Sequence, residues 1–97
     1  MQQRKAIRLV TEFLTKRLGE LGDIRITTGE DGVKYSEYAR EGRAWVCFES
    51  SPMYYHMNDP QMDRFAFMNE FDAFMKDNGL WYERGYAWDL TVLDERD

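Results

Sequence analysis

The sequence predicts one α+β domain in which two amphipathic helices pack on one face of a short-stranded antiparallel sheet. Two long segments carry apolar residues at helical spacing, and several short segments between them have strand patterns bounded by turn residues. With 97 residues, the chain has room for one core. We expect the order α-β-β-β-(β)-α-β-β, a single domain over residues 1–97, and a frayed tail at 94–97.

The first predicted helix runs from about Gln2 to Leu21, and we expect it to span roughly residues 3–20. Apolar residues recur on one side of it at i, i+3, i+4 spacing. These are Ala6, Ile7, Val10, Phe13, Leu14, Leu18 and Leu21. Gly19 and Gly22 follow the last turns, as glycine commonly does beyond a helix end.

The second predicted helix spans residues 60–78. Asn58 and Asp59 supply a capping side chain, Pro60 fits the first helical position, and Gly79 fits the position past the end. Its apolar side carries Phe67, Met68, Phe71, Phe74 and Met75. Along one edge of that side we expect a stripe of carboxylates at seven-residue intervals, formed by Asp63, Glu70 and Asp77.

Short strands are predicted between and after the helices. Ile24–Thr27 alternates, Val33–Tyr38 returns after a glycine-containing turn, and Ala44–Glu49 is apolar enough to be a central strand buried on both faces. Met53–Met57 fits an edge strand because Pro52 cannot donate a ladder hydrogen bond.

A hairpin about Arg84-Gly85 is predicted to complete the sheet, from strands at Leu80–Glu83 and Tyr86–Leu93. Together with the helices it defines the expected core. Six large side chains should be buried there: Phe13, Leu14, Trp45, Phe48, Phe67 and Phe71.

Charge is unevenly distributed along the chain. Residues 1–50 carry nine Lys and Arg against eight Asp and Glu, whereas residues 51–97 carry four against ten, for a total of −5. An acidic second half disfavours nucleic acid as a partner and favours a basic protein partner. The N-terminal stretch is interrupted by charge too early for a signal peptide or membrane span, so we expect a cytoplasmic protein without membrane contact.

Few residues suit catalysis or metal binding. The only cysteine, Cys47, lies in an apolar run and should pack as a small hydrophobe, and His56 is the only histidine. No phosphate-binding glycine loop and no EF-hand pattern is present. We therefore predict a non-enzymatic protein with no metal, no cofactor and no catalytic residue.

The predicted binding residues lie around the start of the second helix. Met62 and Phe65 point away from its apolar side, and Tyr54, Tyr55 and His56 come just before it. Met, Tyr and Phe are enriched at protein interfaces. Asp63, Glu70 and Asp77 would steer a partner from the margin. The alternative is that the last strands fold over Met62 and Phe65 and bury them.

We expect a small acidic protein-binding domain, a class that includes immunity proteins, antitoxins and phage-encoded inhibitors. Two other readings stay open. One is a ligand-binding domain or minor enzyme with an aromatic pocket between sheet and helices, with His56 or Tyr55 at its rim. The other is a homodimer whose aromatic surface serves self-association alone.

Overall fold

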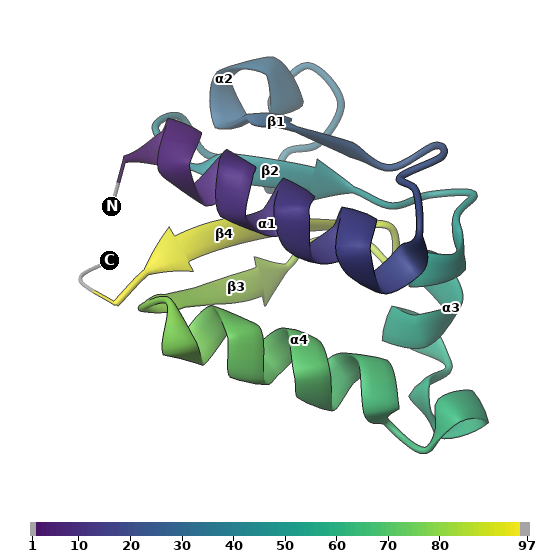
Figure 1. Ribbon diagram of the computed structural model, residues 1–97. Helices are drawn as coiled ribbons and strands as arrows, with labels where there is room; N and C mark the ends of the chain where they lie inside the picture. The colour runs from purple at the N-terminus through teal and green to yellow at the C-terminus, as the bar shows by residue number, and fades with distance from the viewer. Residues whose placement is uncertain (1, 96–97) are drawn as a thin grey trace.

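Four strands form one antiparallel sheet in the order β1-β2-β4-β3 (Figure 1). The strands are β1 (Arg25–Thr28), β2 (Ala44–Cys47), β3 (Leu80–Arg84) and β4 (Asp89–Asp94). The computed structural model describes residues 2–95. The predicted fold class, a single α+β domain with an antiparallel sheet, is confirmed.

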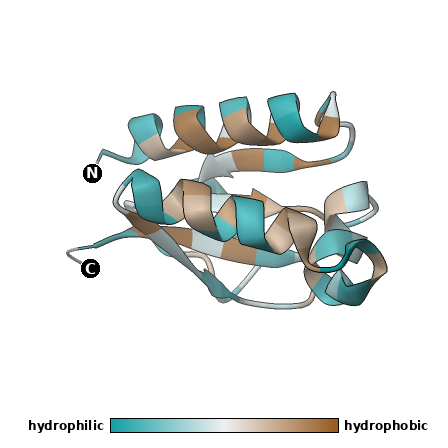
Figure 2. Cartoon of the chain, turned by 60° about the horizontal axis from the view of Figure 1, so that its bottom comes forward, coloured by the Kyte–Doolittle hydropathy of each residue, from teal (hydrophilic) through white to brown (hydrophobic). Residues whose placement is uncertain are grey.

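The two long helices, α1 (Gln3–Leu18) and α4 (Ala66–Asp77), lie on the same side of the sheet and run in opposite directions (Figure 1). Both alternate hydrophilic and hydrophobic segments, as amphipathic helices do (Figure 2). Phe13 of α1 joins them, because its ring lies 4.7 Å from that of Phe74 and 5.7 Å from that of Phe71.

The strand register separates two faces of the sheet. Residues directly opposite one another share a face, so Ile26, Val46 and Leu90 lie together on the helix-covered face. On the helix-free face, Arg25, Cys47 and Asp89 form one cross-strand row and Thr27, Trp45 and Thr91 form the next. Both faces of β2 are covered, as predicted for a central strand.

The predicted core is confirmed with one qualification. Five of the six large side chains are at most 1 % exposed: Leu14, Trp45, Phe48, Phe67 and Phe71. Phe13 is only partly buried.

The predicted strand at Val33–Tyr38 is wrong. The chain forms the short helix α2 (Gly29–Gly32), capped by the Thr28 hydroxyl, and residues 33–43 then cross the helix-free face. Two glycines permit this path. A Cβ on Gly29 would lie 1.6 Å from the Arg40 carbonyl oxygen, and one on Gly32 would lie 2.7 Å from the Trp45 ring. These contacts exclude side chains at both positions.

The predicted edge strand at Met53–Met57 is also wrong, since this segment is the helix α3 (Pro52–Asn58). Pro52 occupies a first-turn position, where its missing N–H costs nothing. Met53 and Met57 are both buried, and their four-residue spacing places them on one helical face.

The second long helix begins later than predicted. Residues Pro60–Asp63 form a 3-10 turn, η1, and Arg64 and Phe65 then adopt left-handed backbone before α4 begins at Ala66. Asp63 therefore lies outside α4, and the predicted three-residue stripe along one helix does not form. The first helix ends at Leu18, where Gly19 has a φ of 89°.

The C-terminal hairpin is confirmed, although Tyr86 and Trp88 lie in its connection rather than in β4. Asp94 ends β4, and the N–H of Glu95 donates to the Gly79 carbonyl, so the predicted frayed tail is ordered to residue 95. Residues 96–97 lie outside the described residues. Within residues 2–95, no helix is long and apolar enough to cross a membrane.

Candidate functional site

Three large apolar side chains within residues 55–65 are exposed, one on α3, one on η1 and one just before α4. Tyr55, Met62 and Phe65 are 62 %, 72 % and 49 % exposed, and we refer to them as the corner residues. The alternative in which the last strands bury Met62 and Phe65 is therefore wrong. Exposed large apolar residues that form one contiguous patch are typical of interaction surfaces.

Phe65 is held outward by an unfavourable backbone conformation. Its φ is 65°, and that of the preceding Arg64 is 58°. For a residue with a Cβ, the left-handed region costs about 1–2 kcal/mol. Hydrogen bonds on both sides of Phe65 maintain it: its N–H donates to the Pro60 carbonyl at 2.9 Å, and its carbonyl accepts from the Asn69 N–H at 2.9 Å.

His56 and Asp63 form a pair behind the corner residues. His56 Nδ1 lies 2.9 Å from Asp63 Oδ2, which also accepts the Phe67 N–H at 3.1 Å. The imidazole stacks on the Phe67 ring at 4.7 Å. Burial opposes ionisation of Asp63, but the Phe67 N–H and His56 outweigh it and lower the pKa of this carboxyl group.

Within residues 2–95, no Ser, Thr or Cys side chain forms a hydrogen bond with His56. The second oxygen of Asp63 is buried without a hydrogen-bond partner in the described part of the chain. No group of three or more His, Cys, Asp or Glu in that part is arranged to hold a metal ion.

The remaining predicted site residues are dispersed. Tyr54 packs partly against the core, with its ring edge-on to that of Tyr55 at 5.6 Å. Glu70 forms an ion pair with Arg17 of α1. Asp77 is exposed near the end of α4 and forms no ion pair among residues 2–95. The structure thus brings His56 into contact with Asp63, and Tyr54 into contact with Tyr55. It does not align Asp63, Glu70 and Asp77 along one helix.

The sequence did not predict a hollow of about 460 Å³ on the helix-free face. We call it the aromatic hollow, and its lining residues are Asp23, Arg25, Tyr35, Trp45, Cys47, Glu49, Ser50 and Trp88. It remains where residues 33–43 stop covering the sheet. The predicted strand at Val33–Tyr38 concealed it, since a strand would have placed Tyr35 within the sheet. The signal available in the sequence was the pair of glycines, Gly29 and Gly32. In the structure, neither position has room for a side chain.

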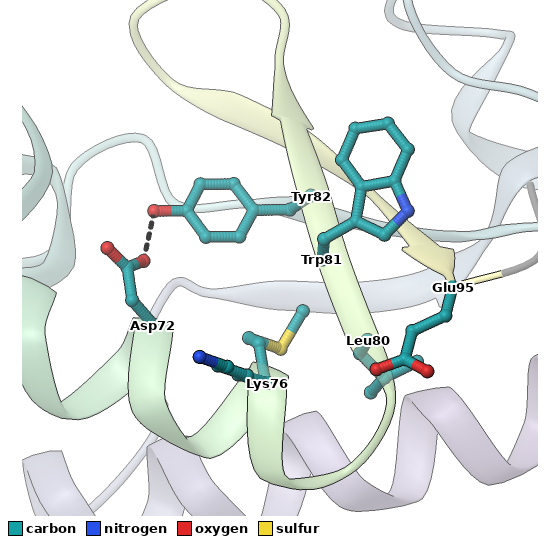
Figure 3. A pocket seen from close by; sticks show the side chains of 7 residues that line it. Asp72, Lys76, Leu80, Trp81, Tyr82 and Glu95 are labelled. Atoms are coloured by element: carbon teal, nitrogen blue, oxygen red, sulfur yellow. Dashed lines mark hydrogen bonds between the residues drawn. The ribbon is translucent and has the colours of Figure 1, made fainter.

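A second hollow, of about 520 Å³, lies between α4 and the edge strand β3 (Figure 3). Tyr82 extends toward α4 and its hydroxyl donates to Asp72 Oδ1 at 2.7 Å, while Trp81 points to the other side of the strand (Figure 3). Burial, together with this hydrogen bond to Asp72, raises the pKa of Tyr82.

No protein-family model, curated protein or solved structure matches this chain.

Proposed function

We propose that this chain is a non-enzymatic protein-binding domain whose partner contacts the corner residues Tyr55, Met62 and Phe65. The observation that carries this proposal is the conformation of Phe65. A large aromatic side chain is kept about half exposed by a left-handed backbone that costs the fold free energy. Such strain tends to accompany function, and glycine would fit the position better.

The chemistry of the corner residues supports a protein as the partner. Burial of exposed Met, Phe and Tyr side chains against another protein contributes favourable free energy to binding. Aromatic anchors commonly dominate the binding energy. The His56–Asp63 pair and the Phe67 N–H fix the backbone on either side of Phe65. The surface is thus ordered before binding, which lowers the entropic cost of association.

The acidic second half of the chain supports a basic partner, because complementary charge accelerates encounter. An inhibitor, immunity or antitoxin-type protein is the narrower form of the proposal. The proposal places the domain in the cytoplasm, where the single free cysteine, Cys47, would stay reduced.

Comparative affinity capture from the native cell tests the proposal. The wild-type domain, Phe65→Ala and Tyr38→Ala would be used as bait, with captured proteins quantified by mass spectrometry. Tyr38 is a matched control because its exposed fraction, 48 %, equals that of Phe65 within one per cent and it lies on the helix-free face. We expect one protein to be retained by wild type and Tyr38→Ala and lost with Phe65→Ala.

Two outcomes would contradict the proposal. One is that every captured protein is retained equally by all three baits. The other is that light scattering shows a wild-type dimer that Phe65→Ala converts to a monomer, which would assign the corner residues to self-association.

A further inference from the structure

The walls of the aromatic hollow are rings held in fixed positions. The Tyr35 ring stacks on Trp45 at 6.2 Å, and the Trp88 ring stacks on Tyr86 at 5.1 Å. Trp45 is 1 % exposed, and its Nε1 donates to Asp89 Oδ2 at 2.9 Å. Because packing and hydrogen bonding fix these rings, a ligand that stacks on them would lose little free energy in ordering them.

The charges around the hollow are mainly negative. Asp23 and Glu49 line it, and the fully buried Asp89 lies next to Cys47 in the cross-strand row of its floor. Among residues 2–95, Arg25 is the one cation lining the hollow, and it already lies over the Tyr35 ring at 4.8 Å. Two lining carboxylates against one guanidinium favour a positively charged ligand over an anion.

The thiol of Cys47 is influenced by the same charges. Burial raises its pKa, and the negative charges of Glu49 and Asp89 raise it further, against the opposing Glu49 N–H and Arg25. A weakly acidic thiol is a poor nucleophile, so the hollow is better suited to non-covalent binding than to thiol chemistry.

We propose that the aromatic hollow binds an organic cation, a guanidinium or a quaternary ammonium group, between the ring of Tyr35, which packs on the buried Trp45, and the ring of Trp88. A cation over an aromatic face is attracted by the ring quadrupole, and the attraction grows as water is removed. Arg25 over Tyr35 is an example of this contact within the chain itself. Glu49 and Asp23 would then neutralise the bound charge.

The proposal does not depend on the corner residues, although the two regions adjoin. A smaller hollow of about 290 Å³, lined by Glu49, Ser50, Trp88 and both Tyr54 and Tyr55, continues from the aromatic hollow toward α3. The cation could therefore be a free small molecule or a basic side chain of a bound protein.

Nuclear magnetic resonance titration of the three indole N–H signals tests the proposal. The probes are choline and N-acetyl-arginine methylamide as cations, N-acetyl-norleucine methylamide as the neutral control and N-acetyl-glutamate as the anion. Trp45 and Trp88 line the hollow, whereas Trp81 lies on β3 and serves as the internal control. We expect a cation to shift the Trp45 and Trp88 signals saturably, while Trp81 and both control probes show no saturable shift.

The charge requirement is tested with matched variants. Glu49→Gln should weaken cation binding about fivefold and the double change with Asp23→Asn about tenfold or more, as expected for the loss of one and two partly exposed charge contacts. Asp77→Asn, an exposed carboxylate on α4, should change nothing. Trp88→Leu should abolish the shift of Trp45, with the remaining amide spectrum confirming a retained fold.

A pentapeptide, Gly-Gly-Arg-Gly-Gly, separates the two sources of the cation. Binding at least tenfold tighter than the blocked arginine would identify a protein side chain, and equal binding would identify a free cation; both support the site. Saturable binding of the anion alone would overturn the proposal, as would the absence of a saturable shift with either cation. Equal cation binding by wild type and the Glu49→Gln, Asp23→Asn variant would also overturn it.

Discussion

Nδ1 of His56 lies 2.9 Å from Oδ2 of Asp63, and this contact joins α3 to the 3-10 turn that precedes Phe65. The same carboxylate oxygen accepts the Phe67 N–H in the first turn of α4. One oxygen atom therefore ties together three consecutive elements. We infer that it fixes the position of the corner residues, since the left-handed residues Arg64 and Phe65 lie between its two contacts.

Replacing Asp63 should change the acid stability of the fold. The pKa of Asp63 is lower in the folded state than in the unfolded chain. Ionised Asp63 therefore stabilises the fold at pH values above its unfolded pKa, near 4. That stabilisation is lost as the pH falls through the folded pKa. Thermal unfolding measures the melting temperature between pH 6 and pH 2. Asp63→Asn should have a lower melting temperature than wild type at pH 6, and its melting temperature should fall less as the pH is lowered. Parallel curves for the two proteins would contradict the assigned role, and Asp77→Asn is the control.

Glycine at position 65 should leave the stability of the fold nearly unchanged. Phe65→Gly relieves the left-handed strain but loses chain entropy and the burial of about half of the ring, so we expect the free energy of unfolding to stay within about 1 kcal/mol of wild type. In contrast, Phe71→Ala removes a buried ring and should cost about 3–5 kcal/mol. Urea unfolding measures both. A loss of stability in Phe65→Gly comparable to that in Phe71→Ala would show that Phe65 belongs to the core.

The buried contact between Trp45 and Asp89 should contribute to stability. Trp45→Phe leaves Oδ2 of Asp89 without its donor inside the fold, and we expect a loss of at least about 2 kcal/mol. Trp88→Phe is the matched control because that ring is only partly buried, and it should cost under about 1 kcal/mol. Equal losses for the two variants in urea unfolding would argue against the hydrogen bond as the cause.

The fold elements that could be predicted from the sequence are those with a strong local pattern. The long helices and β2 are amphipathic or continuously apolar, and packing reinforces the same preference. Met53–Met57 was misassigned because two methionines four residues apart fit one face of a helix and one face of a strand equally. Val33–Tyr38 was misassigned because its path depends on Gly29 and Gly32 packing against distant parts of the chain.

The candidate site was predictable only in part. Met62 and Phe65 are exposed, but not for the predicted reason, because both precede α4 and their angular position on a continuous helix does not apply. The left-handed backbone at Phe65 could not be predicted, since phenylalanine rarely adopts it. Likewise, the pairing of Glu70 with Arg17 depends on how α4 packs against α1.

Tyr82 should make the fold sensitive to alkaline conditions. Burial and the hydrogen bond to Asp72 raise its pKa, so the folded state favours the protonated hydroxyl. This contribution to stability is fully present at pH values below the pKa of tyrosine in the unfolded chain, near 10. It is lost as the pH rises above that value. Between pH 9 and pH 11, Tyr82→Phe should lose less stability than wild type in urea unfolding, and Asp72→Asn should fall between them. If Tyr82→Phe loses as much as wild type, the hydroxyl is not the group responsible.

The dissociation rate of the captured partner is the most direct test of the corner residues as a binding surface. Surface-immobilised wild type, Phe65→Gly and Tyr38→Ala would be compared by biolayer interferometry with the purified partner. Phe65→Gly is the decisive variant because it should be about as stable as wild type, so weaker binding cannot be attributed to unfolding. We predict dissociation about 30-fold faster for Phe65→Gly, corresponding to about 2 kcal/mol, with Tyr38→Ala unchanged. Unchanged dissociation from Phe65→Gly would contradict the assignment of the binding surface to this corner of the molecule.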